Sequence, residues 1–398
     1  MFFTGIPESM EAVIIKDNKP VIDKSVRVPL LDDGFILIKV LSVAANPMEW
    51  KHIEYHMGPD GSVLGSDVAG IVVAIGSGIP SDEFKIGDCV CSFVHGSSVR
   101  MPGNGAFAEY CAIDANIAFK LPQDFLTKNV PSFPSNEKYI RIPEGPVNSI
   151  ESAATMPVAL ITAGAILIHE LRLKLIWEPK QPQIDSPILI WGGATSVGQI
   201  LIQMIKKLNA FSKIIVVASK KHNQTLSKFG ADSIYDYHDA DILTKIRSNH
   251  KDIRYIIDVV SNEDTINQVY KCAPADSPTT IIQLEYLNIE QIDPQVRRDD
   301  VKIIGTLIYL ISGYDVRLGE YYFPANPQFR KDLIRYIKFI NPKLIDGQIH
   351  HIPMKLYNHG LNDIPLFTNM IKNGETYGYK LVTSLQNDPD DKKEMSAD

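Results

Sequence analysis

The chain has 398 residues, of which 45% are apolar and 22% charged, so it can form a sizeable core and its length favours two globular domains. A formal charge of -7 argues against a nucleic-acid surface, and four cysteines are too few for a disulfide framework. The apolar runs fall far short of the roughly 20 residues that cross a bilayer, and the first residues do not resemble a signal peptide. We therefore expect a cytoplasmic protein that binds neither nucleic acid nor membrane.

The first third of the chain carries short β-like runs separated by glycines. These runs lie at residues 12–15, 35–43, 68–75, 89–94 and 108–113. Their pattern predicts a partly open β-barrel. Several prolines and mixed charge over residues 121–146 then predict a long irregular segment.

From residue 149 the spacing of apolar residues becomes helical, and alternating strands and helices follow. Strands are expected at residues 188–191, 214–218, 234–235, 255–260 and 280–284. This alternation predicts a doubly wound parallel sheet with helices on both faces. A helix at 327–340 and a strand at 380–385 should rejoin the N-terminal domain. Residues 387–398 hold five acidic residues against two lysines and predict a disordered acidic tail.

The strongest motif is a glycine turn between the strand at 188–191 and an amphipathic helix. Glycines allow a tight turn and close approach of the backbone to a pyrophosphate, while the helix N-terminus supplies unpaired N–H groups. The turn therefore predicts a dinucleotide site, although a turn that merely packs helix on strand stays possible. Its residues are Gly192, Gly193, Thr195, Ser196, Val197 and Gly198, with Thr195 in place of the usual middle glycine.

The residues after the second strand of this sheet bear on the choice of cofactor. An acidic residue at this place would bind the ribose 2′-hydroxyl of NAD. The chain instead has Ser219, Lys220 and Lys221. A hydroxyl and two ammonium groups can bind a 2′-phosphate, so the sequence favours NADPH. The alternative is that the two lysines are simply solvated.

Several short motifs resemble, in this order, the zinc-lacking enoyl reductase and quinone oxidoreductase branch of the medium-chain dehydrogenase/reductases. The resemblance covers about residues 10 to 385. The glycine turn and the segment at 46–51 look most like fungal trans-acting enoyl reductases and yeast zinc-less alcohol dehydrogenase-like proteins. The motifs are Asn46-Pro-Met-Glu-Trp-Lys51, Leu64-Gly-Ser-Asp67-Val-Ala-Gly70, Gly87-Asp88, Gly105-Ala-Phe-Ala-Glu109-Tyr110, Pro157-Val-Ala-Leu-Ile-Thr162-Ala-Gly164, Trp191-Gly-Gly-Ala-Thr-Ser-Val-Gly198, Phe229-Gly-Ala-Asp232 and Asp236-Tyr237.

The resemblance implies a GroES-like catalytic domain at 10–160 and 311–385, a Rossmann domain at 161–310 and a substrate cleft between them. It further implies that Thr195 and Val197 lie at the pyrophosphate and Thr162 beside the nicotinamide ribose. Ser219, Lys221 and Tyr237 would surround the 2′-phosphate.

Zinc-containing relatives use a cysteine and a Gly-His-Glu segment where this chain has Asn46 and Gly65-Ser66-Asp67. A thiolate and an imidazole are missing together, so we expect no metal. The resemblance favours Lys51 and Tyr55 near the nicotinamide and Asn46 as a polar substrate contact. Asp67 is assigned a structural role, and His52 and His56 are treated as loop residues.

Without a Lewis acid, reduction of an α,β-unsaturated carbonyl asks less of the protein than direct carbonyl reduction, because an enolate is less basic than an alkoxide. The expected activity is therefore NADPH-dependent hydride transfer to the activated C=C bond of a small-molecule enone or quinone. One alternative is an NADPH-dependent aldehyde reductase or alcohol dehydrogenase. Another is a non-catalytic NADPH-binding scaffold or trafficking protein. The sequence leaves monomer and homodimer equally open.

Overall fold

The computed structural model describes residues 5–126, 133, 137–285 and 287–385. The described residues form two compact units, one drawn from Met1–Val158 with Tyr309–Asp398 and the other from Ala159–Ile308. The acidic tail expected at 387–398 lies outside the described residues. Within the described part, no helix is both long enough and apolar enough to cross a membrane.

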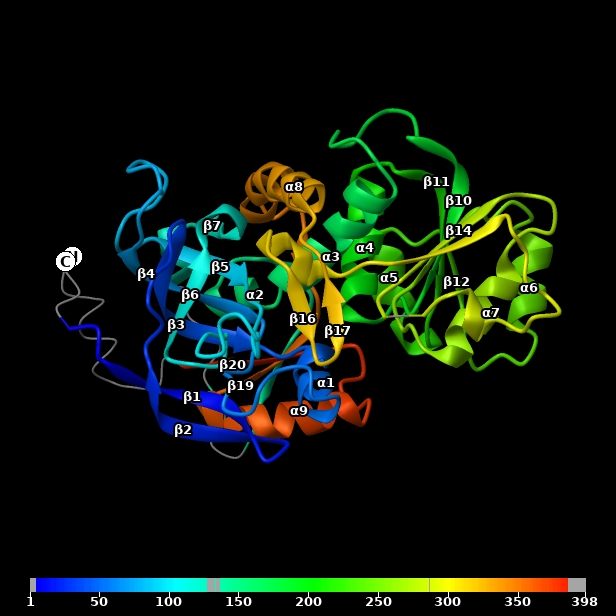
Figure 1. Ribbon diagram of the computed structural model, residues 1–398. Helices are drawn as coiled ribbons and strands as arrows, with labels where there is room; N and C mark the ends of the chain where they lie inside the picture. Colours follow the sequence, from blue (N-terminus) through cyan, green and yellow to red (C-terminus); the bar gives the residue numbers. More distant parts are fainter. Residues whose placement is uncertain (1–4, 127–132, 134–136, 286, 386–398) are drawn as a thin grey trace. The chain divides into compact units, whose positions relative to one another are not determined.

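A six-stranded sheet forms the centre of the described second unit, and all its strand pairs are parallel (Figure 1). The first strand in the sequence lies inside the sheet, so the strand order reverses there, which confirms the predicted Rossmann architecture. In spatial order the strands are β12 (Ser233–Tyr235), β11 (Phe211–Val217), β10 (Ile184–Trp191), β13 (Tyr255–Asp258), β14 (Thr279–Gln283) and β15 (Val301–Gly305).

Helices cover both faces of this sheet, as alternate residues of β11 show. Ile215 and Val217 pack in one core with residues of α6 (Ile242–Asn249) and α7 (Glu263–Cys272). The intervening residue Val216 points to the opposite face, because neighbouring strand residues alternate. There it lies near Gly193 and the side chain of Ile202 in α4 (Ser196–Lys207). The α-helices α3 (Pro157–Gly164) and α5 (Asn223–Phe229) also lie in this region.

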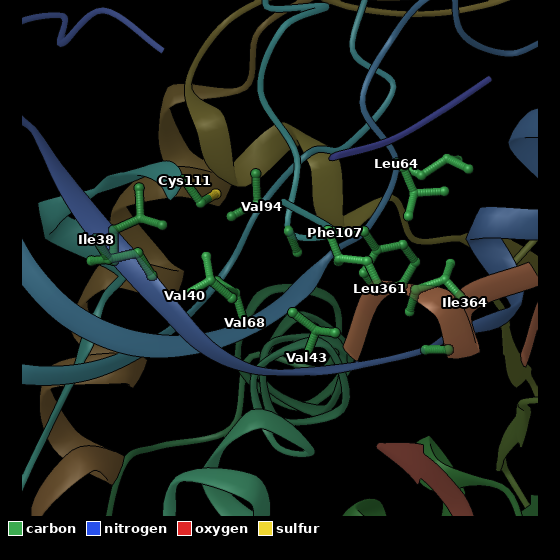
Figure 2. Close-up of a cluster of buried hydrophobic side chains, with 14 of the residues drawn as sticks. Ile38, Val40, Val43, Leu64, Val68, Val94, Phe107, Cys111, Leu361 and Ile364 are labelled. Atoms are coloured by element: carbon green, nitrogen blue, oxygen red, sulfur yellow. The ribbon is translucent and has the colours of Figure 1, made fainter. Parts of the chain in front are cut away.

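The first unit contains an eight-stranded sheet among its described residues, antiparallel except for the pair β19–β20. It encloses an apolar core to which Ile38, Val68 and Phe107 contribute, together with Ile364 from α9 (Ile364–Lys372) (Figure 2). This is the GroES-like fold that the sequence predicts. Its strands are β7 (Phe119–Leu121), β5 (Cys89–Phe93), β4 (Asp67–Ile75), β3 (Phe35–Ala44), β20 (Lys380–Ser384), β19 (Met354–Tyr357) and β8 (Ile140–Ile142) in order, with β6 (Tyr110–Asp114) paired to β3.

Smaller elements complete the first unit. A separate antiparallel pair joins β1 (Ser9–Lys16) to β2 (Lys19–Arg27), and a hairpin joins β16 (Val316–Leu318) to β17 (Tyr321–Phe323). Besides α9, the α-helices of its described part include α1 (Pro47–Glu54), α2 (Ile150–Ala154) and α8 (Pro327–Ile345).

Two sequence-based expectations for this unit are wrong in part. The segment 121–146 is not wholly irregular, because β8 pairs with β19 and β9 (Gly145–Pro146) pairs with β18 (His350–His351). Strands of two or three residues are too short to show alternation in a sequence. Helix α8 also continues past Pro342 to Ile345. Proline removes one backbone hydrogen bond, and burial of Leu344 offsets part of that loss.

Candidate functional site

The glycine turn joins β10 to α4 in the second unit. Gly192 has a φ of +90°, a left-handed backbone conformation that favours glycine. A Cβ at Gly198 would meet the carbonyl oxygen of Gly192 at 2.5 Å. Bare backbone at these two positions lets strand and helix meet closely and would give a pyrophosphate access to the first N–H groups of α4.

Thr195 stands where the middle glycine is usual, and it is the N-cap of α4. Its φ of -70° and ψ of 164° are extended backbone that any residue adopts. The Oγ1 atom accepts a hydrogen bond from the Gly198 N–H at 3.1 Å. Ser196 and Val197 follow as the first helical residues, whose N–H groups have no partner inside the helix. The threonine therefore preserves the turn, and the residues present fit a bound dinucleotide.

Ser219, Lys220 and Lys221 follow β11, and Tyr237 follows the neighbouring strand β12. Ser219 is half-buried and both lysines are exposed. The Tyr237 ring is 52% exposed, with its centroid 4.1 Å from that of His238. Because the carboxyl ends of neighbouring parallel strands meet at one edge of a sheet, the four predicted residues share that edge.

Asp236 lies at the same edge and is missing from the sequence-based site. Its carboxylate accepts hydrogen bonds from the N–H groups of His238 at 3.0 Å and Lys220 at 3.1 Å. These hydrogen bonds lower the pKa of Asp236 to about 2, so the group is ionised at neutral pH. The sequence places Asp236 beside Tyr237, but only the pairing of β11 with β12 brings it to Lys220.

Thr162 is the one predicted cofactor residue outside the glycine turn, the start of α4 and the two loops that follow β11 and β12. It belongs to α3 and is buried, with 4% of its surface exposed. The geometry of the glycine turn does not involve it. Its proposed place beside the nicotinamide ribose thus rests on the family resemblance.

The first unit contains a buried polar cluster, defined as Asn46, Glu49, Asp67 and Lys380. The Lys380 Nζ atom lies 2.9 Å from the Asp67 Oδ2 atom, and the two side chains are 2% and 0% exposed. Lys380 also donates to the Asn46 amide oxygen, and the Asn46 Nδ2 group donates to Asp67 at 2.9 Å. Both polar atoms of the Asn46 side chain, the predicted substrate contact, are therefore bonded within the protein.

Glu49 is the member of this cluster whose carboxyl group has a raised pKa. Its Oε2 atom accepts from the Asn46 N–H at 2.6 Å, while Oε1 has no hydrogen-bond partner among the described residues. Burial raises the pKa of Glu49 to about 8, although the Lys380 charge opposes that rise. The spacing of Asn46 and Glu49 is a capping-box signal that sequence reasoning missed. No sequence signal leads to Lys380, which is 334 residues from Asn46.

Lys51 and Tyr55, the predicted proton donors, come together around the indole of Trp50. The Lys51 Nζ atom lies 5.7 Å from the Trp50 ring centroid, and the Tyr55 ring lies 5.8 Å from it, centroid to centroid. Tyr55 is the C-cap of α1 and is 55% exposed, whereas Asn46 is the buried N-cap. The three predicted residues thus occupy two different ends of one helix.

His52 points into a different environment from Lys51. Its Nε2 atom lies 2.7 Å from the Tyr309 hydroxyl, and the imidazole of His95 stacks on the Tyr309 ring with centroids 4.0 Å apart. Burial lowers the pKa of His52 to about 4, so this imidazole is neutral at pH 7. Treating His52 as a loop residue was wrong, because it is buried within α1. The sequence holds no signal that joins His52, His95 and Tyr309.

The positions that would supply zinc ligands hold poor donors for that metal. Asn46, Ser66 and Asp67 offer no thiolate or imidazole, and the Lys380 ammonium binds two of the three side chains. Within the described ranges, no group of three or more His, Cys, Asp or Glu side chains is placed to hold a metal ion. Cys89 and Cys91 are buried free thiols, and burial raises the pKa of both.

Comparison with known proteins gives matches along most of the chain. Residues 32–123 match the alcohol dehydrogenase GroES-like domain, and residues 196–315 match the zinc-binding dehydrogenase domain. An uncharacterized protein of Saccharomyces cerevisiae is 49% identical over 382 residues, which cover 96% of this chain and 99% of the relative. Trans-enoyl reductase caaB of Aspergillus niger is 30% identical over 367 residues, covering 90% of this chain and 92% of the relative.

Solved structures share the fold at lower identity. A Rhizobium etli protein described as a zinc-dependent alcohol dehydrogenase matches with a TM-score of 0.71 and 18% identity, covering 95% of this chain and 99% of its own. The quinone oxidoreductase of Coxiella burnetii matches with a TM-score of 0.64 and 19% identity, covering 95% and 100%. These likenesses concern the fold and agree with the two architectures described above.

Proposed function

Since this chain belongs to the medium-chain dehydrogenase/reductase family, among oxidoreductases that use a nicotinamide cofactor and small-molecule substrates, we propose a finer activity. It is an NADPH-dependent reductase that transfers hydride, without zinc, to the activated C=C bond of an α,β-unsaturated carbonyl compound or a quinone. The observation that carries this proposal is the Lys380 ammonium bound between Asn46 and Asp67, at the positions where zinc-dependent relatives place metal ligands.

The cofactor part of the proposal rests on the second unit. The N-terminus of α4, with Gly192, Gly193 and Thr195 before it, would hold the pyrophosphate. Ser219, Lys220, Lys221 and Tyr237 would hold the 2′-phosphate, and Thr162 the nicotinamide ribose. Asp236 would oppose the 2′-phosphate, but its hydrogen bonds to two backbone N–H groups partly offset that charge.

The choice of a C=C bond follows from the proposed lack of zinc. A bound reduced nicotinamide would supply the hydride. A C–H bond would form at the β carbon, the C=C electron pair would shift to the bond between the α carbon and the carbonyl carbon, and the C=O π pair would move to the oxygen. The resulting enolate needs only hydrogen-bond donors and a proton at the α carbon. The trans-enoyl reductase relative is consistent with this chemistry.

Lys51 and Tyr55 are the proposed proton donors. Both lie beside Trp50 on the solvent-accessible side of α1, where a proton can be replaced from water. We expect Lys51→Met to lower kcat by about a hundredfold with little change in KM, the usual size of a general-acid effect. Tyr55→Phe removes only a hydroxyl and tests that group in the same assay. An unchanged kcat in both variants would remove this pair from the mechanism.

We also propose that the protein is cytoplasmic and that it is a monomer or a homodimer. Four buried free thiols suit a reducing compartment such as the cytoplasm. Size-exclusion chromatography with light scattering would decide between monomer and homodimer.

The proposed activity is tested by following NADPH consumption against a panel of enones, quinones and aldehydes, with product identification. We expect turnover of the enones or quinones, with the enone products saturated at the former double bond. Turnover of aldehydes alone would replace this activity by aldehyde reduction. Tight NADPH binding without any turnover would favour the non-catalytic scaffold.

A further inference from the structure

A cavity of about 720 Å³ lies within the first unit, between the end of β5, the segment around Arg100, β6 and the β16–β17 hairpin. Cavities of this size hold drug-sized ligands, and their walls are usually apolar with a few polar groups that orient the ligand. The apolar wall here includes Phe35, Phe93, Val94, Met101, Ile113 and Ile117. Such a wall suits a hydrophobic compound.

His95 is a polar residue on the wall of this cavity. Its Nε2 atom is shielded from solvent and has no hydrogen-bond partner among the described residues. The side chain as a whole is only half-buried and lines the cavity. Burial lowers the pKa of His95 well below its ordinary value, so the imidazole is neutral.

A neutral imidazole carries its proton on one nitrogen only. A buried lone pair without a partner costs less than a buried N–H without one, so the proton belongs on Nδ1 rather than on Nε2. This tautomer places the N–H donor on Nδ1, which is not among the shielded polar atoms that lack a partner in the described part of the chain. The donor is suited to a carbonyl oxygen inside the cavity.

Stacking and hydrogen bonding fix the orientation of the His95 ring. Tyr309 stacks on one face with a centroid distance of 4.0 Å, and His52 holds the Tyr309 hydroxyl at 2.7 Å. Phe93 packs against the same tyrosine, 5.9 Å between centroids. A donor held in this way is pre-organised for a ligand.

Two arginines at the cavity favour a flat, conjugated ligand. The Arg100 guanidinium lies over the Tyr314 ring, 3.7 Å from its centroid, and Arg317 lies 5.3 Å from the Tyr322 ring centroid. All four residues line the cavity. Guanidinium groups and tyrosine rings stack on other planar groups, so these walls would accept an aromatic ring.

We propose that this cavity binds the substrate, a flat aromatic or conjugated carbonyl compound, and that the His95 Nδ1–H group donates a hydrogen bond to its carbonyl oxygen. This inference rests on the proposed reductase activity, because it identifies the substrate class of that activity. It makes His95 a binding and specificity residue, with Tyr309 and His52 as positioning residues.

The test uses the full-length protein and two probes, benzylideneacetone as a reducible enone and benzylacetone as its saturated counterpart. Titration calorimetry with benzylacetone reports binding without turnover. We expect His95→Phe, which keeps the stacking on Tyr309 but has no N–H donor, to weaken this binding about tenfold. His95→Asn retains an N–H near the Nδ1 position and should recover most of the affinity. His350→Phe makes the same change away from the cavity and should bind benzylacetone normally.

A second variant tests the cavity itself. Met101→Trp fills part of the space and should abolish benzylacetone binding while leaving the thermal midpoint and NADPH binding close to those of the unchanged protein. Normal affinity in both His95→Phe and Met101→Trp would overturn this inference. If benzylideneacetone is not reduced but benzylacetone still binds with the expected losses in the variants, the proposed activity fails and the cavity assignment stands.

Discussion

The glycine turn of the second unit and the buried polar cluster of the first unit are constructed in opposite ways. The turn is formed by residues 192–198, which are contiguous, so strand, turn and helix N-cap follow one another along the chain. The cluster joins Asn46 and Asp67 to Lys380, which comes from the last described strand. The glycine turn is a local structure, so its geometry can be inferred from its own sequence. The buried polar cluster forms only when the unit folds, so its loss should lower the stability of the whole unit.

The largest expected effect comes from breaking the buried ion pair. Lys380→Met leaves the Asp67 carboxylate buried without its cation, which should reduce the free energy of unfolding by about 3–5 kcal/mol. Lys372→Met is the matched control, because Lys372 pairs with Glu54 at 2.8 Å on the exposed surface. Removing an exposed pair should cost less than about 1 kcal/mol. Denaturant unfolding measures both variants.

A double variant sharpens this prediction. Asp67→Asn combined with Lys380→Met removes both charges and should be more stable than Lys380→Met alone, since no buried charge is left unpaired. Equal stability of the Lys380→Met and Lys372→Met variants would contradict a structural role for the cluster.

The next largest effect should arise in the glycine turn. At Gly198 an added methyl group would meet backbone atoms of Gly192 and Gly193, which cannot move without distorting the turn. Gly198→Ala should therefore destabilise the protein by about 1–3 kcal/mol. It should also weaken the binding of NADPH and of NADH to a similar extent. Gly103→Ala is the control, because a Cβ there would meet nothing within 4 Å. Normal binding of both cofactors to Gly198→Ala would argue against this turn as the pyrophosphate site.

A smaller and more selective effect is expected at the edge of the sheet. Lys221→Ala should raise the Kd for NADPH about tenfold and leave that for NADH nearly unchanged, because only NADPH carries the 2′-phosphate. Lys228→Ala removes the same charge at the far end of α5 and serves as the control. Fluorescence titration gives both constants. A similar rise for NADPH and NADH would remove Lys221 from the 2′-phosphate site.

The most gradual expected effect is a pH dependence from Glu49, spread over several pH units. Folding raises the pKa of this carboxyl from an ordinary 4.5 to about 8, so the folded protein holds a proton that the unfolded chain loses. The Glu49 contribution to stability is therefore complete below pH 4.5 and is lost as the pH rises toward 8, by at most about 1.4 kcal/mol per pH unit. Glu49→Gln should flatten this decline in unfolding experiments. An identical decline in the variant would show that Glu49 is ionised in the folded protein.

The fold could be predicted from the sequence wherever the signal is periodic and contiguous. The parallel strands around Ile190 and Ile215 and the helix beginning at Ser196 follow from apolar spacing, and Gly192 marks the turn between them. Short elements such as β8 and β9 could not be predicted, because their partner strands β19 and β18 lie some two hundred residues away along the chain.

The residues of the candidate site also differ in whether the sequence alone could indicate them. Ser219 and Lys221 could be proposed from their distance along the chain from the glycine turn, and Thr195 from its place within that turn. Asp236 was missed because strand pairing, rather than sequence distance, brings it to Lys220. The contacts of Lys380 with Asp67 and of Tyr309 with His52 could not be predicted, because no local pattern distinguishes a buried lysine or tyrosine from an ordinary one.

The most direct test of the proposed chemistry is to follow deuterium from NADPH labelled at the nicotinamide carbon that donates hydride. With benzylideneacetone as substrate, we predict benzylacetone with deuterium on the former β carbon. Deuterium on the carbinol carbon of an allylic alcohol would contradict it, because the enzyme would then reduce the carbonyl group rather than the C=C bond.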